Sequence, residues 1–150
     1  MSLKQRIGDD MKAAMKARDS RRLSAIRLLL AAVKQREIDD RLELDDAGVT
    51  AVVERAVKQR RDAANQYADA GRNDLADAER FEIEVLSAYL PEQLDEAAIE
   101  AAIAKAMAET GSTQPSDMGR LMSALKPALA GRADMARVSA LARKALAAGS

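Results

Sequence analysis

Pro91 is the residue that most constrains how this chain folds. It lies in Tyr89–Leu94, after a long region rich in Ala, Leu, Glu, Lys and Arg, residues that favour helix over strand. Proline lacks the backbone N–H that a helix interior needs, and it disfavours helical backbone at the preceding residue. The stretch therefore predicts a break between long, charged helices and a tail of shorter, Ala-rich helices.

Apolar residues recur at three- and four-residue intervals on both sides of this break, and no alternating strand pattern of useful length occurs. The pattern predicts an all-α protein with an N-terminal long-helix bundle over residues 1–92 and a small three-helix tail domain over 93–150. Helices are predicted over about residues 3–18, 21–42, 74–89 and 96–109. Three more are predicted: a third helix that ends at about residue 70, a sixth that begins at about residue 116 and a seventh that begins at about residue 135. Their predicted caps are Ser2, Asp19 or Ser20, Asp46 or Thr50, Asn73, Asp95 and Asp134, and Pro115 or Ser116 is predicted to open the sixth helix.

Few chemical classes of catalytic site are open to this composition. Large apolar side chains are thin, and the aromatic residues are Tyr67, Phe81 and Tyr89, so thin helix pairs are expected rather than a thick globule. With no Cys and no His, the chain has no thiolate, disulfide or imidazole base, and no Ser–His triad. Its acidic pairs are adjacent in sequence and diverge on a helix. No catalytic residue, metal ligand or cofactor site is assigned, and a non-catalytic protein is favoured.

The N-terminal sequence has no apolar segment typical of a signal peptide. The longest apolar run, Leu28 to Val33, is far too short to span a bilayer. The expected location is therefore the cytoplasm, and a membrane is not expected as a partner.

Charge is distributed unevenly along a chain whose formal net charge is zero. Residues 1–36 carry ten basic and three acidic side chains, a net +7, and residues 111–150 carry six and two, a net +4. The region between them carries the compensating −11. Two basic ends are suited to nucleic acid, or to attraction within the protein.

Basic residues form three groups along the chain. The first surrounds one inter-helix corner and consists of Lys12, Lys16, Arg18, Arg21 and Arg22. The second consists of Lys58, Arg60 and Arg61. In the tail, the residues predicted to contact phosphate are Arg120, Lys126, Arg132, Arg143 and Lys144. Since aromatics for stacking bases are nearly absent, backbone contact with a folded RNA is the expected mode.

Short segments in order along almost the whole chain resemble the YqeY-like proteins of the GatB/YqeY group. These segments are Asp10–Lys16, Leu23–Arg27, Glu54–Asp62, Tyr89–Leu94, Asp117–Met122 and Gly131–Asp134. The part after Pro91 is similar to the tail domain of the B subunit of the glutamine-dependent aspartyl/glutamyl-tRNA amidotransferase. Gly119–Met122 and Gly131–Asp134 match that tail's Gly-x-Val-Met and Gly-x-Ala-Asp/Asn pattern, although the link between them, which includes Pro127, is longer here.

The resemblance implies a helical two-domain protein whose tail helps to hold tRNA; nothing in the chain resembles the amidotransferase's catalytic domain. The preferred hypothesis is a non-catalytic tRNA- or RNA-binding or amidotransferase-accessory protein that acts through its tail. One alternative is a protein-interaction adaptor that uses the N-terminal helices, because residues 23–33 form a wide apolar face. Another is the carbon–nitrogen ligase activity, with glutamine as amido donor, that the family name suggests.

Overall fold

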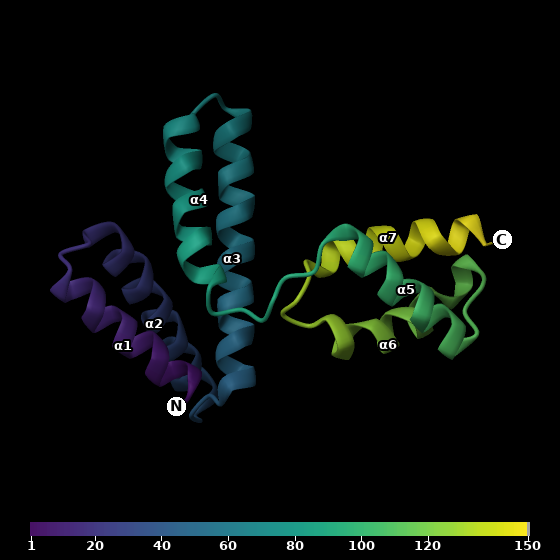
Figure 1. Cartoon of the computed structure of the whole chain (residues 1–150), viewed down its shortest axis with the longest axis horizontal. Helices are drawn as coiled ribbons and strands as arrows, with labels where there is room; N and C mark the ends of the chain where they lie inside the picture. The colour runs from purple at the N-terminus through teal and green to yellow at the C-terminus, as the bar shows by residue number, and fades with distance from the viewer. Residues whose placement is uncertain (150) are drawn as a thin grey trace. The chain divides into compact units, whose positions relative to one another are not determined.

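Residues 1–149 of the computed structural model form seven α-helices, one short 3-10 helix and no strand, so the all-α prediction is confirmed (Figure 1). The elements are α1 (Leu3–Lys16), α2 (Ser20–Asp40), α3 (Asp46–Asp69), α4 (Asn73–Ser87), α5 (Glu96–Thr110), η1 (Pro115–Asp117), α6 (Met118–Leu129) and α7 (Met135–Ala148). The chain divides into two compact units, residues 1–90 (unit 1) and the part from Pro91 onward (unit 2).

Most of the predicted helix caps are found in the structure, and the starts of α3 and α4 are exceptions. Ser2 and Gln5 form a capping box on α1, and Asp95 and Asp134 cap α5 and α7 as predicted. The cap of α3, however, is Asp45, whose carboxylate accepts the Gly48 N–H. The prediction that Asp46 or Thr50 caps this helix was wrong. The Asp46 carboxylate instead accepts the Leu3 N–H at 2.9 Å, a contact between segments that are distant in the sequence.

The second exception is the start of α4. Asn73 is not its cap but its first helical residue, and no side chain caps this helix. The guanidinium of Arg72 instead pairs with the Asp74 carboxylate at 3.1 Å. At the other end, α4 stops at Ser87, before Tyr89 and Pro91, and single turns carry the chain to Leu90.

Unit 1 consists of two helical hairpins, α1–α2 and α3–α4, packed around one apolar core (Figure 1). Its fully buried side chains include Ile7, Ile26, Leu29, Val53 and Leu86. Burial of such side chains contributes about 1.5–3 kcal/mol each. The buried side chains come from both hairpins, so each hairpin supplies part of the shared core.

Polar contacts fasten the start and the middle of α1 to the rest of unit 1. Near its start, Lys4 Nζ lies 2.5 Å from Glu37 Oε2 on α2, and the same oxygen accepts the Leu44 N–H at 2.8 Å. These contacts lower the pKa of Glu37 and raise that of Lys4. Farther along, Asp10 accepts the hydroxyl of buried Tyr89 at 2.6 Å.

Unit 2 packs α5, α6 and α7 around buried Ile103, Leu121, Leu125, Leu129 and Leu146. Pro127 lies in the last turn of α6, which ends two residues later at Leu129. Proline lacks the N–H that would donate to the Ser123 carbonyl four residues earlier, so α6 loses one backbone hydrogen bond here and ends within a turn.

The segment that precedes α5 is part of unit 2. Leu94 N–H donates to the carbonyl of Arg132 at 2.8 Å, and Gln93 Nε2 donates to the carbonyl of Gly131 at 2.7 Å. Gly131 has a φ of 77°, a left-handed conformation that glycine adopts without a Cβ penalty. The compact units thus divide two residues before the predicted boundary of residues 92 and 93.

Candidate nucleic-acid interface

All five tail residues predicted to contact phosphate are exposed at the surface of unit 2. They lie along the length of this unit and not at one point. Lys126 and Arg132 lie near the α6–α7 turn, whereas Arg143 and Lys144 follow eight and nine residues into α7, about 12 Å farther at 1.5 Å per residue. Such an extended arrangement suits a ligand with repeated charges better than a single anion.

Arg120 is bound to its own unit. Its Nη1 donates to the carbonyl of Thr110 at 3.1 Å, and its Nη2 lies 3.3 Å from Asp117 Oδ1. Asp117 also accepts the backbone N–H groups of Thr113 and Gln114, which lower its pKa more than Arg120 does. Arg120 therefore joins the start of α6 to the end of α5, and its charge is already partly neutralised.

Arg132 combines an exposed side chain with a firmly held backbone. Its N–H donates to the Leu129 carbonyl at 2.9 Å, and its own carbonyl accepts the Leu94 N–H. Among the described residues, no carboxylate lies within ion-pair distance of its guanidinium, and the same holds for Lys126, Arg143 and Lys144. These four cations are therefore open to an external anion.

Arg137 is a cation of the tail that the sequence analysis did not select. Its Nη2 lies 2.6 Å from Glu96 Oε2, an ion pair between α7 and the first turn of α5. Arg137 is the main cause of the lowered pKa of Glu96, and Lys144 adds to it. Arg137 and Lys144 are seven residues apart, a spacing that places both on one helix face and could have identified them together.

The basic groups of unit 1 differ in their pairing. Arg60 is half-buried, with its Nε 2.7 Å from Glu82 Oε2 on α4, so it serves as a structural contact between α3 and α4. The group at the α1–α2 corner has no ion-pair partner among residues 1–149. Arg21 instead lies over the Phe81 ring, 4.3 Å from its centroid.

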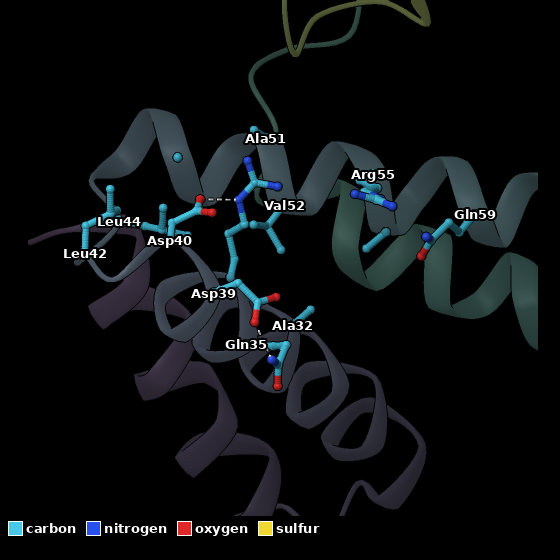
Figure 2. A pocket seen from close by; sticks show the side chains of 13 residues that line it. Ala32, Gln35, Asp39, Asp40, Leu42, Leu44, Ala51, Val52, Arg55 and Gln59 are labelled. Carbon is cyan, nitrogen blue, oxygen red and sulfur yellow. Dashed lines mark hydrogen bonds and ion pairs between the residues drawn. The ribbon is translucent and has the colours of Figure 1, made fainter.

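A groove between α2 and α3, with a volume of about 450 Å³, was not predicted from the sequence. Figure 2 shows Leu42 and Leu44 at one end and small apolar residues such as Ala51 and Val52 along it. The polar side chains on its α2 side bond to one another, Arg36 to Asp40 at 2.6 Å and Gln35 to Asp39 at 2.8 Å (Figure 2). The groove therefore presents mainly apolar surface.

The adaptor hypothesis rests on the apolar face of residues 23–33. Most of this face is buried in the core of unit 1. Ala25, Ile26, Leu29 and Val33 are buried, whereas Leu28 is 53% exposed. Within the described part of the chain, no group of three or more acidic side chains could hold a metal ion. No helix among those described is both long and apolar enough to cross a membrane.

A family model described as Yqey-like protein matches residues 4–146. The chain is also similar to yeast proteins named "Altered inheritance of mitochondria protein 41, mitochondrial". The relative from Lachancea thermotolerans is 33% identical over 110 residues, which cover 71% of this chain and 59% of that protein. The one from Eremothecium gossypii is 37% identical over 82 residues, covering 54% and 45%. The chain thus spans about half the length of the relatives it matches.

These comparisons correct one expectation and confirm another. The cytoplasmic location expected from the sequence is wrong by this comparison, because the relatives are named as mitochondrial proteins. The resemblance to YqeY-like proteins, by contrast, is confirmed over nearly the whole length, and the chain belongs to the Yqey-like protein family.

Proposed function

We propose that this protein is a non-catalytic RNA-binding protein whose unit 2 contacts the phosphate backbone of a folded RNA, with tRNA as the expected class. The observation that carries the proposal is Arg132, an exposed cation on a turn whose backbone is held by two hydrogen bonds. Because the backbone of Arg132 is already fixed, only its side chain has to lose conformational freedom when it binds phosphate.

The other open cations of unit 2 extend this contact. Lys126 lies in the last helical turn of α6, before the loop that carries Arg132, and Arg143 and Lys144 lie on α7. Residues 111–150, which include α6 and α7, carry a net +4, whereas residues 91–150 together carry seven basic and seven acidic side chains. The attraction for a polyanion therefore belongs to the α6–α7 part and not to unit 2 as a whole. Both tyrosines and the phenylalanine lie outside unit 2, which leaves it no aromatic ring on which a base could stack. Contact with a folded backbone is the mode that fits.

The resemblance of the tail to that of the tRNA amidotransferase B subunit supports tRNA as the ligand class and a role as accessory to such an enzyme. Gly131 and Arg132, on which the fixed turn depends, are part of the matching Gly131–Asp134 segment. In this proposal the chain holds RNA, and any bond-forming chemistry belongs to a partner.

Binding of bulk tRNA to the full-length protein, measured by filter binding over a series of KCl concentrations, tests the proposal. Arg132→Glu and Lys144→Glu should each weaken binding several-fold at low salt. Each should also reduce the slope of log K against log salt by about one, because each removes about one phosphate contact.

Lys105→Glu is the matched control. Lys105 is an exposed cation of the same unit, on α5, but its ammonium lies 4.0 Å from the Glu109 carboxylate. The same reversal of charge there should change the affinity much less. Equal losses from all three variants would mean that only net charge matters, and the assignment of the site would fail. A wild-type protein that binds no tRNA at low salt would refute the function itself.

A further inference from the structure

The turn between α1 and α2 brings together the densest group of cations in unit 1. Helix α1 ends at Lys16, Arg18 lies in the turn, Asp19 caps α2, and α2 begins at Ser20. Residues 12–22 contain one acid, Asp19, and five basic residues. These five define the α1–α2 corner and are Lys12, Lys16, Arg18, Arg21 and Arg22.

No ion pair within unit 1 holds the side chains of the corner, although Glu84 lines a small pocket together with Arg22, and Glu82 lines one together with Arg21. The described residues supply no ion-pair partner to any of the five, and the Asp19 carboxylate is engaged by the Arg22 backbone N–H at 3.2 Å. Lys12, Lys16 and Arg18 are exposed, and Arg21 is exposed but oriented over Phe81. Like charges held so close repel one another, a cost that a bound polyanion would remove.

Arg18 adds a second cost, in the backbone. Its φ is 55°, which lies in the left-handed region. Glycine adopts this region without a steric penalty, whereas a residue with a Cβ is strained there. Gly71, Gly111 and Gly131 occupy comparable positions elsewhere in the chain, with φ of 75°, 68° and 77°. Arg18 thus lowers the stability of unit 1 in two ways, through backbone strain and through repulsion between like charges. A role in binding a ligand accounts for its presence better than a role in stabilising the fold does.

We propose that the α1–α2 corner is a second RNA-contacting surface that binds phosphate through these side chains. The inference rests on the proposed RNA-binding function and extends it to unit 1. The ligand is a duplex or folded backbone, because Phe81 is covered by Arg21 and Tyr89 is buried, so neither ring is free to stack a base. An anionic membrane fits less well, because Met15 is the exposed large apolar side chain here, and membrane-surface helices present a broad apolar face.

The chain contains a matched pair of residues for the test. Arg41 has the same φ of 55° at the end of α2, but it follows Asp39 and Asp40 and precedes Glu43. Arg18→Gly and Arg41→Gly therefore remove the same charge and relieve the same strain, and both should leave the fold intact or stabilised. Loss of binding in Arg18→Gly cannot then be ascribed to unfolding.

The experiment is tRNA binding by the full chain as a function of KCl, with Arg18→Gly, Lys16→Gln and Arg41→Gly. The first two should each bind several-fold more weakly at low salt, with a salt slope smaller by about one. Arg41→Gly should bind as the wild type does. Equal binding by Arg18→Gly, Lys16→Gln and wild type would overturn the inference.

Two comparisons separate the possible failures. If Arg132→Glu abolishes binding while the corner variants do not, the tail proposal stands and the corner is excluded. If the corner variants alone lose binding, the corner is supported and the tail site fails. Flotation with phosphatidylcholine–phosphatidylglycerol vesicles completes the test: if Arg18→Gly weakens vesicle binding but leaves tRNA binding unchanged, the corner is a membrane surface and the inference is wrong.

Discussion

Arg18 and Arg41 adopt the same left-handed conformation, with φ of 55° at each, in opposite electrostatic surroundings. Among the described residues they are the non-glycine positions with positive φ. The neighbours of Arg18 in the sequence are mainly basic, whereas Arg41 lies among Asp39, Asp40 and Glu43. The pair separates the energetic effect of backbone conformation from that of local charge.

Replacement of either arginine by glycine should stabilise unit 1. Relief of the left-handed strain exceeds the added entropy of the unfolded glycine by about 0.5–1 kcal/mol. Arg18→Gly should stabilise more, because it also removes repulsion, whereas Arg41→Gly removes attraction. Urea unfolding followed by tyrosine fluorescence measures this, since Tyr67 and Tyr89 both lie in unit 1 and the chain has no Trp. The difference should shrink at high salt; a larger gain for Arg41→Gly would contradict the argument.

Tyr89→Phe should destabilise unit 1 by about 1 kcal/mol near neutral pH, since the hydroxyl bond to half-buried Asp10 is lost. Burial, and then the Asp10 carboxylate, raise the pKa of Tyr89 above its usual value of 10.0. The folded protein therefore retains the hydroxyl proton longer than the unfolded chain does. Stability from this group is present below pH 10 and falls as the pH rises toward the higher folded pKa.

The measurement for Tyr89 is stability as a function of pH on the alkaline side, followed by helical circular dichroism. Tyr89→Phe should show a shallower decline above pH 10 than the wild type. A difference titration of tyrosine absorbance between the two proteins isolates the ionisation of Tyr89. Parallel declines would show that the hydroxyl does not control alkaline unfolding.

Glu96→Gln should reduce the loss of stability of unit 2 in acid. Arg137 lowers the pKa of Glu96 from 4.5 in the folded state. Ionised Glu96 thus stabilises unit 2 above pH 4.5, and this contribution disappears as the pH falls through the lower folded pKa. The thermal midpoint of the variant should change less between pH 7 and pH 3, measured by circular dichroism, with Glu109→Gln as a control for charge loss on α5.

We also expect Glu96→Gln to change the affinity for tRNA. Glu96→Gln frees Arg137 and removes a negative charge near Lys144. If α7 contacts phosphate, tRNA binding should tighten several-fold at low salt, with a steeper salt dependence. Weaker binding by a folded variant would show that the ion pair itself shapes the contact surface.

Gly131→Ala should destabilise unit 2 by about 1 kcal/mol, because a Cβ is disfavoured at a φ of 77°. Its carbonyl also accepts Gln93 Nε2, so any relaxation of the turn loosens the segment before α5. Unfolding followed by circular dichroism should show the lower stability of unit 2. The unfolding transition followed by tyrosine fluorescence, which reports on unit 1, should stay unchanged. Weaker tRNA binding in the folded variant would link the rigidity of the turn to its cation, Arg132.

Much of the fold follows from local sequence. Helix formation depends on hydrogen bonds four residues apart, so apolar spacing, caps such as Ser2, Asp95 and Asp134, and the interruption at Pro91 predict the all-α class. Where two neighbouring acids compete, this local logic is insufficient. Asp45 caps α3 and Asp46 does not, because Asp46 bonds to Leu3 from another helix.

The sequence by itself determined the helices, the position of the break, the family and the supply of cations. Only the tertiary structure decided which cations are already paired with another helix: Arg60 with Glu82, and Arg137 with Glu96. It also formed the α2–α3 groove and left the cations of the α1–α2 corner without an ion pair to any residue from 1 to 149. The physical reason is range: a helix is specified by neighbours along the chain, whereas pairing between helices depends on which faces packing brings together.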